Sequence, residues 1–326
     1  MTDNWNLLGH DWAVDMLRRH IATGEARHAY LFAGPPGVGR RTLALAFARA
    51  LNCTNPPAPG EFCGTCRDCK HTQSMQHPDM AVVRAENEGG TLKVEQVREV
   101  KRVVSLKPYQ SKYRIALFLR FQEANDNASN ALLKTLEEAP SHVILLLTAD
   151  NTESLLPTIV SRCEVLRLRP LPIEMVEREL VSRGVESDQA QLIAHISGGR
   201  PGYAFRLAED KSLMEFRQTR LNDLQKLITG SRVDKFAYAE KLAKEKDTMR
   251  QVLLVWQSFW RDVFLRASKA DTPLANVDRV EEIELLSTRL DLPGARQRVS
   301  ETEQAIKRLE RNVNARLLAE VLLLGW

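Results

Sequence analysis

The sequence predicts an α/β domain built on a parallel sheet, followed by an all-helical second half. Short apolar runs alternate with helical patterns from His28 to Leu168, which is typical of a parallel sheet with helices on both faces. A glycine-rich segment directly follows the first of these runs. Beyond Pro172 we find no strand pattern, and apolar residues recur at helical spacing.

Each element of the first half is predicted from its own residues. Short, mostly apolar runs indicate buried strands at 28–33, 80–83, 115–119, 143–148 and 165–168. Helices are expected at 42–51, 94–106 and 128–138. Because every strand after the first is separated from its predecessor by a helix or a long connection, the strands are expected to run parallel.

The second half begins after Pro170 and Pro172. Helices are predicted at 173–184 and 187–197, and a turn at 198–202 leads into a helix that continues through Leu207. The stretches 236–242, 249–265 and 304–324 show the i, i+3, i+4 apolar spacing of amphipathic helices, and Asp271-Thr-Pro indicates a loop.

Length and composition restrict the class of protein. A chain of 326 residues is long enough for two or three domains, and 44% hydrophobic with 27% charged residues excludes a mostly disordered chain. The longest apolar run, 143–147, is too short to cross a bilayer, and no secretory signal is visible, so we expect a cytoplasmic protein without a membrane partner. A formal net charge of +4 does not by itself indicate nucleic-acid binding.

The glycine-rich segment reads Gly34-Pro-Pro-Gly37-Val-Gly39-Arg40-Arg41-Thr42. Because it follows a strand and opens a helix, its backbone N–H groups could face a phosphate. A working phosphate loop has Lys and then Ser or Thr after its last glycine, for the phosphates and for Mg²⁺. Arg40 and Arg41 occupy these positions, and arginine cannot ligate Mg²⁺. Nucleotide binding and a purely structural turn are therefore equal alternatives.

The second half of an ATPase site is also degenerate. Carboxylates that hold Mg²⁺ and polarise water would be needed at the end of strand 115–119. Leu119 and Arg120 stand there instead, and Glu123 lies farther on, where a loop is expected. With both halves altered, we expect the fold of an ATPase without ATP hydrolysis in cis.

Two further segments carry a resemblance to a known family. Asn130-Ala-Leu-Leu-Lys-Thr-Leu-Glu-Glu-Ala-Pro140 and Ser161-Arg162-Cys163 resemble motifs of the clamp-loader subunits of bacterial DNA polymerase III. The resemblance implies an AAA+ P-loop-type parallel sheet at 1–169 with an insertion at 53–69, a three-helix lid at 170–209, and a helical collar at 210–326 through which five subunits form a ring. It also implies a role in DNA replication, the ATP-driven loading of a sliding clamp onto primed DNA.

The resemblance further implies partners: gamma/tau-type ATPase subunits, a delta-type clamp-opening subunit, the sliding clamp and primed DNA. Because the chain departs from the hydrolysing pattern at Arg40, Arg41, Leu119 and Arg120, it resembles a non-hydrolysing subunit. Such a subunit is no enzyme by itself but part of a DNA-directed DNA polymerase by assembly. Arg200 lies too early after the lid turn to be assigned as a sensor arginine.

In the Ser-Arg-Cys motif of this family the arginine reaches the ATP of the neighbouring subunit, which implies that Arg162 is an arginine finger in trans. A guanidinium there stabilises charge on the departing γ-phosphate, worth ~10³–10⁵ in rate at well-studied fingers. The alternative is a surface arginine paired with Glu164. Cys163 lacks a paired histidine, so we expect a small buried thiol rather than a nucleophile.

Four of the five cysteines lie close together, at Cys53, Cys63, Cys66 and Cys69. Two C-x-x-C steps that share Cys66 can bring three sulfurs together in one turn, and Cys53 can complete a tetrahedral site. We expect structural Zn²⁺, with an iron–sulfur cluster as the alternative. His71 and His77 lie nearby but are surplus to a four-cysteine site.

Contacts with DNA can be expected only from local groups of basic residues. The candidates are Lys93, Arg98, Lys101 and Lys134, which would face phosphates in the channel of a ring. The alternative is a solvated helix face, which has the same appearance in sequence.

Apolar residues crowd two stretches of the C-terminal half, 259–264 and 321–326. A free monomer does not usually leave such groups in water unless they pack on their own domain or on a partner. We therefore expect the residues from about 211 onward to carry most of the stable assembly into a hetero-oligomer.

Three functions are compatible with these patterns. The first is a clamp-loader subunit that does not hydrolyse ATP and supplies Arg162 to a neighbour. The second is an active AAA+ ATPase of the gamma/tau or branch-migration-helicase type, against which Arg41 and Leu119 argue. The third is a zinc-dependent nucleic-acid-binding module on an inactive ATPase fold.

Overall fold

The computed structural model describes residues 4–87, 89–310 and 313–326. The chain divides into two compact units, Met1–Pro172 with Arg200–Tyr203, and Ile173–Gly199 with Ala204–Trp326. In the described ranges, no helix is both long and apolar enough to span a membrane.

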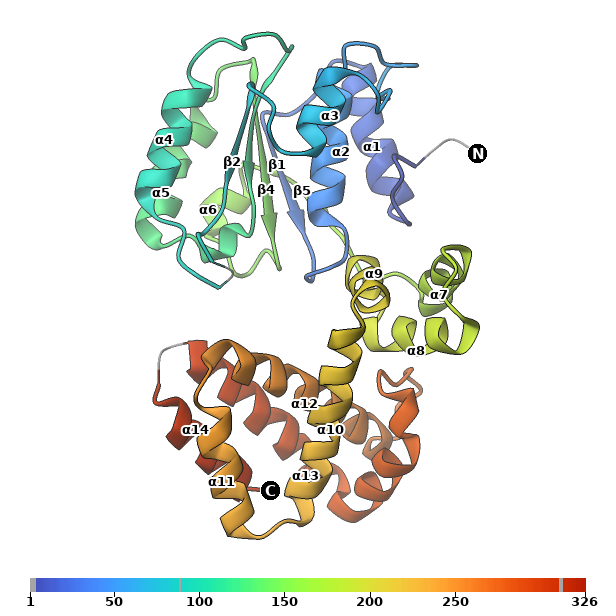
Figure 1. Ribbon diagram of the computed structural model, residues 1–326. Coiled ribbons are helices and arrows are strands. Elements are labelled where there is room, and N and C mark those ends of the chain that lie inside the picture. Colours follow the sequence, from blue (N-terminus) through green and yellow to red (C-terminus); the bar gives the residue numbers. More distant parts are fainter. Residues whose placement is uncertain (1–3, 88, 311–312) are drawn as a thin grey trace. The chain divides into compact units, whose positions relative to one another are not determined.

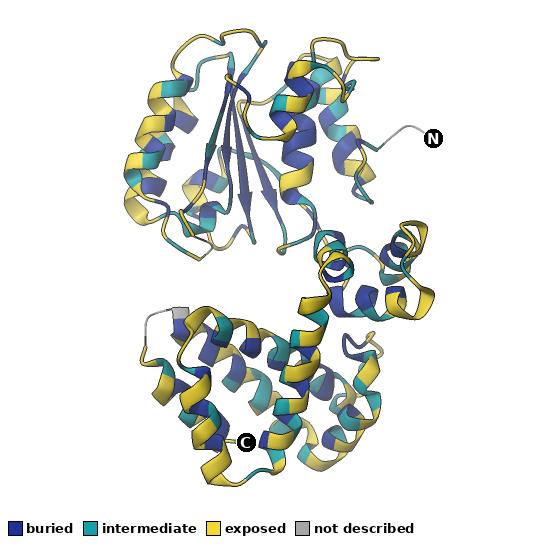
Figure 2. Ribbon diagram, in the orientation of Figure 1, coloured by how far each residue is buried: buried dark blue, intermediate teal, exposed yellow. Residues whose placement is uncertain are grey.

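The first unit contains one five-stranded parallel sheet between layers of helices (Figure 1). Its strands are β1 (Ala29–Ala33), β2 (Met80–Val83), β3 (Arg114–Phe118), β4 (Val143–Ala149) and β5 (Glu164–Arg167), in the order β2-β3-β4-β1-β5. Three of them, β1, β3 and β4, are buried along their whole length (Figure 2), as expected for parallel strands covered on both faces. The predicted α/β fold class is confirmed.

Helices cover both faces of this sheet. They are α1 (Asp11–Ala22), α2 (Arg40–Asn52), α3 (Arg67–Gln73), α4 (Val94–Val104), the 3₁₀ turn η1 (Phe121–Glu123), α5 (Asp126–Glu137) and α6 (Pro157–Val160). Successive strand residues point to opposite faces, so Leu146 joins the core under α1 and α2, whereas Leu145 and Leu147 join the core under α4 and α5. These two apolar layers fix the ends of the strands, where the candidate sites lie.

The described part of the second unit is helical throughout, apart from its turns and loops. Its elements are α7 (Ile173–Ser182), α8 (Ser187–Ser197), α9 (Pro201–Glu209), α10 (Lys211–Thr229), α11 (Arg232–Leu242), α12 (Lys246–Ala267), the 3₁₀ turn η2 (Val277–Arg279), α13 (Val280–Glu310) and α14 (Ala315–Leu324). The first residues of α9 are grouped with the first unit. The predicted helical second half is confirmed, and the loop predicted in the 270s precedes η2.

The helix predicted at 304–324 is wrong as a single element. Val313 and Asn314 are not helical, and the side chain of Asn314 caps α14 by accepting a hydrogen bond from the backbone N–H of Leu317 at 3.1 Å. Residues 311–312 of the predicted helix lie outside the described ranges. Because α13 and α14 pack into the same apolar core, the apolar spacing continues across the break and hides it.

The apolar C-terminus largely packs on its own unit. The Trp326 ring lies 5.1 Å from the ring of Trp256 and 5.6 Å from that of Trp260, centroid to centroid. Leu322 and Leu323 are buried in the same core. What stays exposed is a stripe on α14 formed by Leu317, Val321 and Leu324, which are 56%, 59% and 42% exposed. Of the two expected alternatives, packing on the chain's own domain therefore holds for most of this apolar end, and the narrower stripe is the part of α14 that remains available to a partner.

Candidate functional site

The glycine-rich segment forms the loop between β1 and α2. Gly37 and Gly39 have φ angles of 85° and 113°, a left-handed conformation that favours glycine. The carbonyl of Gly37 accepts a hydrogen bond from the backbone N–H of Gly202 at 2.8 Å, and Nε2 of the buried His10 lies 3.0 Å from the carbonyl oxygen of Val38. Burial lowers the pKa of His10, so the imidazole favours its neutral form. The loop is thus held by the chain's own groups.

Arg40 stands where a phosphate-binding lysine would be needed, and its positive charge is paired with a carboxylate of the same chain. Its Nη1 lies 2.8 Å from Oδ1 of Asp150, and the arginine side chain is only 9% exposed. The N–H bonds do not align with the carboxylate oxygen, so the contact is an ion pair rather than a hydrogen bond. Arg41 and Thr42, the next residues of α2, are exposed.

Asp150 was missed by the sequence analysis. It directly follows β4, and β4 is the neighbour of β1 in the sheet. Because parallel strands end at the same edge, the order of the strands would have brought Asp150 close to the loop after β1.

The end of β3 holds no carboxylate at the two expected positions. Leu119 is buried, and Arg120 takes a left-handed backbone conformation with φ 53°. Nε of Arg120 lies 2.8 Å from Oε1 of Glu123, and the same oxygen accepts a hydrogen bond from the backbone N–H of Gly89 at 3.0 Å. Oε1 of Glu123, the first acid after Leu119 and Arg120 along the chain, is therefore already engaged by Arg120 and Gly89.

The Ser-Arg-Cys segment follows α6 and joins it to β5. Nη2 of Arg162 lies 2.8 Å from Oε1 of Glu137 on α5, and Nη1 donates to the carbonyl oxygen of Thr158 at 2.9 Å. The arginine side chain is 35% exposed. The expected alternative partner, Glu164, is wrong: the acid that pairs with Arg162 comes from α5, which packs beside α6.

Cys163 is half-buried against the apolar core under α4 and α5. Burial raises the pKa of its thiol to about 12. A thiol with a raised pKa is a poor nucleophile at neutral pH, in line with the expected inert thiol.

The four clustered cysteines converge as predicted. Their sulfur atoms all lie within 4.8 Å of one another, with Cys53 Sγ 3.7 Å from Cys63 Sγ and 4.0 Å from Cys66 Sγ. Zn–S bonds of about 2.3 Å in a tetrahedron require sulfurs about 3.8 Å apart. The cluster therefore fits a tetrahedral zinc ion, and four protein ligands would leave no position for a catalytic water.

Backbone N–H groups also point at these sulfurs. Cys63 N donates to Cys53 Sγ at 3.3 Å, Cys66 N to Cys63 Sγ at 3.3 Å, and Cys69 N to Cys66 Sγ at 3.4 Å. The hydrogen bond from Cys66 N lowers the pKa of Cys63 to about 6, whereas burial raises the pKa of Cys69. Such amide donors favour the thiolate form that binds a metal.

His77 is not a fifth candidate ligand. Its Nε2 lies 3.1 Å from Oδ1 of the buried Asp68, and its Nδ1 accepts a hydrogen bond from the backbone N–H of Asp79 at 3.0 Å. Both ring nitrogens of His77 thus face groups of the chain itself.

The insertion that carries the cysteines is anchored to α1 and α2. Glu61 accepts a hydrogen bond from Trp5 Nε1 at 3.1 Å and pairs with Arg18 Nε at 2.7 Å. The Arg49 guanidinium on α2 lies 4.0 Å from the centroid of the Phe62 ring. These contacts attach the segment directly before Cys63 to the rest of the first unit.

The four basic candidates for DNA contact all lie exposed on one side of the sheet. Lys93 precedes α4, Arg98 and Lys101 lie one turn apart on it, and Lys134 lies on the adjacent α5 (Figure 1). Exposed acidic residues, Glu95 among them, share α4 with these bases. The surface is therefore mixed in charge.

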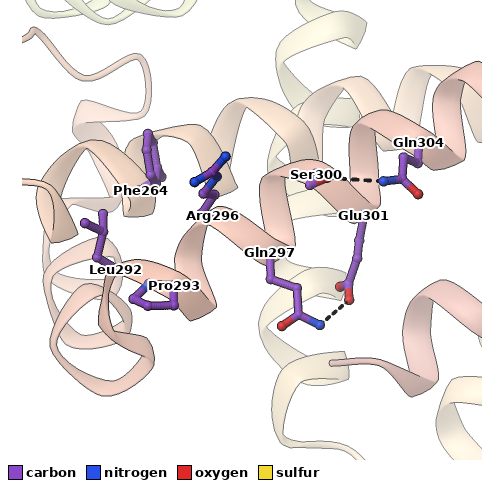
Figure 3. Close-up of a pocket in the computed structure, with 8 residues that line it drawn as sticks. All are labelled: Phe264, Leu292, Pro293, Arg296, Gln297, Ser300, Glu301 and Gln304. Atoms are coloured by element: carbon purple, nitrogen blue, oxygen red, sulfur yellow. Dashed lines mark hydrogen bonds between the residues drawn. The ribbon is translucent and has the colours of Figure 1, made fainter.

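A groove of about 620 Å³ lies in the second unit, beside the part of α13 that follows a kink at Asp291 (Figure 3). It is lined by Phe264, Leu292, Pro293, Arg296, Gln297, Ser300, Glu301 and Gln304. Its acid, Glu301, is bonded to Gln297 at 2.7 Å and to Arg298 at 3.0 Å. The groove therefore offers no uncommitted carboxylate for acid–base chemistry.

Comparison with known proteins identifies the family. The model described as "DNA polymerase III, delta subunit" matches residues 9–172, and the model described as "DNA polymerase III, delta subunit, C terminal" matches residues 212–326. Together the two matched ranges include both candidate loops, the cysteine cluster and nearly all of the helices from α10 to α14, whereas α7, α8 and α9 lie between the two ranges.

Curated relatives agree with these models. DNA polymerase III subunit delta' of Pseudomonas aeruginosa strain PAO1 is 33% identical over 222 residues, which is 67% of this chain and 67% of the relative. Subunit delta' of Bacillus subtilis strain 168 is 27% identical over 315 residues, 95% of this chain and 94% of the relative. Subunit tau of Escherichia coli strain K12 is 31% identical over 175 residues, 54% of this chain but 27% of tau. The chain therefore belongs to the delta-subunit family of DNA polymerase III and is similar to its delta-prime subunits.

Proposed function

We propose that this chain is a clamp-loader subunit of bacterial DNA polymerase III that does not hydrolyse ATP and supplies Arg162 to the ATP of a neighbouring gamma/tau-type subunit. One observation carries the proposal. Arg40, in the chain's own phosphate loop, is buried and paired with Asp150, whereas Arg162 is about one-third exposed at the surface.

Two features support the absence of hydrolysis in cis. A nucleotide phosphate entering the loop would compete with Asp150 for a buried guanidinium that is already neutralised. Leu119 and Arg120 also supply no carboxylate for Mg²⁺ at the end of β3. Both changes remove charge partners that an ATPase needs at the moment of phosphoryl transfer.

The surroundings of Arg162 support its role in trans. A guanidinium has five N–H donors, and its contacts with Glu137 and Thr158 engage Nη2 and Nη1. Nε has no partner among the residues that the structure describes. An exposed, always charged group with a donor to spare is suited to bind a phosphate that another subunit presents.

The remaining parts of the proposal follow from the family. We assign the lid to 170–209, the collar to 210–326, and the exposed α14 stripe to a contact within the ring. A delta-type subunit, the sliding clamp and primed DNA complete the assembly, with Lys93, Arg98, Lys101 and Lys134 as the DNA-facing candidates. A structural zinc ion on the four cysteines holds the insertion.

Reconstitution tests the proposal. The chain should co-purify with a gamma/tau-type ATPase and a delta-type subunit. Arg162→Ala should leave this complex intact but lower its ATP turnover and clamp-loading rate by at least several-fold, since a guanidinium no longer stabilises charge at one interface. The loss should be partial if other interfaces keep their own arginines. Arg169→Ala, an exposed arginine beyond β5, serves as the matched control. Unchanged turnover by an intact Arg162→Ala complex would refute the trans role.

The active-ATPase alternative is tested on the isolated chain. We expect no ATP turnover above the buffer rate. Turnover that disappeared on mutating Arg40 would contradict the proposal and favour the gamma/tau-like alternative.

Metal analysis tests the cysteine site. Protein purified under reducing conditions should contain about one zinc per chain, and Cys63→Ser together with Cys66→Ser should abolish it. Chelation should increase protease cleavage within 53–70 while the main thermal transition persists, because the core of the first unit does not depend on one metal. Iron instead of zinc, or loss of the whole transition, would contradict this assignment.

A further inference from the structure

We propose that Glu137 is a positioning residue for Arg162, whose carboxylate holds the guanidinium ready for a phosphate presented by a neighbouring subunit. The inference rests on the proposed trans role of Arg162 and adds that its orientation is set within its own chain, before assembly.

The contacts of Arg162 define its orientation from two elements. Oε1 of Glu137, the last residue of α5, lies 2.8 Å from Nη2, and the carbonyl oxygen of Thr158 on α6 accepts from Nη1 at 2.9 Å. Oγ of Ser161 lies 3.4 Å from Nη1. Two acceptors on separate elements restrict the plane of the guanidinium more than one would.

Both of these elements are fixed to the core of the first unit. Leu132 and Leu136 of α5 are buried under the sheet, and the side chain of Asn125 caps the helix by accepting from Ala128 N at 2.8 Å. Ile159 on α6 is fully buried. Because α5 and α6 are held by packing, the acceptors that they present are rigid, and this favours a preorganised arginine.

The ion pair suits positioning rather than stability. The side chains of Arg162 and Glu137 are 35% and 51% exposed, and exposed ion pairs contribute little to folding. A long arginine that must be ordered at the moment of binding loses side-chain freedom. If Glu137 already holds the arginine before assembly, part of that entropy loss is removed. The benefit then appears in the rate of the step in which negative charge develops on the phosphate.

The end of α5 provides a matched control, because it carries two adjacent glutamates. Two glutamates follow each other there, and Glu137 is the one that contacts Arg162, while Glu138 is an exposed residue at the helix end. Glu138→Gln therefore removes the same charge from almost the same place without touching the pair. It is the matched control for Glu137→Gln.

A double-mutant cycle on the reconstituted complex tests the proposal. Glu137→Gln should lower the turnover number for ATP by about twofold to fivefold, with KM for ATP changed less than twofold, because geometry rather than ground-state binding is lost. In the Arg162→Ala background the same substitution should have no further effect. Glu138→Gln should behave as wild type, and Glu137→Asp should recover part of the loss.

The outcomes separate the two proposals. If Arg162→Ala leaves turnover unchanged, the trans role itself fails. If Arg162→Ala lowers turnover but Glu137→Gln leaves it unchanged or raises it, the positioning role alone is refuted, and a rise would mean that Glu137 restrains the arginine instead. An equal loss from Glu137→Gln in both backgrounds would assign Glu137 a structural role. Thermal unfolding of each variant identifies a folding defect, in which case Glu137→Asp carries the test.

Discussion

Arg40 and Arg162 lie in the same unit, each 2.8 Å from a carboxylate oxygen, yet their surroundings are opposite. The Arg40 side chain is 9% exposed and its partner Asp150 38%, whereas the Arg162 side chain is 35% exposed and its partner Glu137 51%. Arg40 stands in a loop closed by contacts from His10 and Gly202. Arg162 stands on a surface turn beside its partner helix.

The comparison teaches that burial, rather than distance, separates a structural ion pair from one that is available to a ligand. A buried charge without its partner is costly, because the protein interior solvates it poorly. A surface pair exchanges its partner for water or a phosphate at little cost. The degenerate loop therefore contains an arginine that belongs to the fold, and the Ser-Arg-Cys turn contains one that can act on another molecule.

The largest expected difference is in stability. Asp150→Ala leaves the buried Arg40 unpaired and should lower the free energy of unfolding by about 2 kcal/mol, less than for a fully buried pair because Asp150 is partly exposed. Glu137→Ala removes the acid from the surface pair and should change it by at most about 0.5 kcal/mol. Urea unfolding followed by circular dichroism measures both. Equal losses would break the comparison.

A smaller effect is expected when the phosphate loop is restored in sequence. Arg40→Lys, Arg41→Thr and Leu119→Asp together should produce no ATP turnover by the isolated chain, since a positioned water and a neighbour's arginine are still missing. The single change Arg40→Lys should lower the free energy of unfolding by about 1 kcal/mol, because lysine does not reproduce the guanidinium pair with Asp150. ATP turnover by the triple variant would show that the substituted side chains alone prevent hydrolysis in the wild-type chain.

The smallest effect concerns pH. Burial lowers the pKa of His10 in the folded chain, so the unfolded chain binds the proton more readily below its ordinary value of 6.5. Stability should therefore fall as the pH drops from about 6.5 towards 5, by about 1 kcal/mol or less. His10→Gln should flatten this part of the stability curve, and Arg162→Ala should leave it unchanged. A curve that His10→Gln does not alter would exclude the histidine under the loop as its source.

The sequence predicted most of what depends on local pattern. The strands were expected to within about one residue at each end because runs such as 143–148 are buried on both faces, which leaves little choice of structure. The four cysteines were identified completely because their spacing places them in one turn and one helix end.

Contacts between residues that are far apart in the sequence could not be predicted from local pattern. Glu164 was chosen as the alternative partner of Arg162 because it is near in sequence, whereas Glu137 becomes a neighbour only when α5 packs beside α6. The contact between Asp150 and Arg40 could be predicted only with the knowledge that β4 lies next to β1 in the sheet. The break before α14 was hidden by continuous apolar spacing, although Asn314 was a capping signal that could have been read.

The Arg40–Asp150 pair has a further consequence for how this subunit responds to its surroundings. A protein stabilised by a bound ligand gains free energy that rises with the ligand's concentration, about 2.7 kcal/mol at one hundred times the dissociation constant. In this chain the counter-charge is part of the same polypeptide, and its local concentration cannot be diluted. If no nucleotide enters the loop, the folded population of this subunit would stay the same when cellular ATP rises or falls, while that of ATP-binding neighbours would follow the ATP concentration.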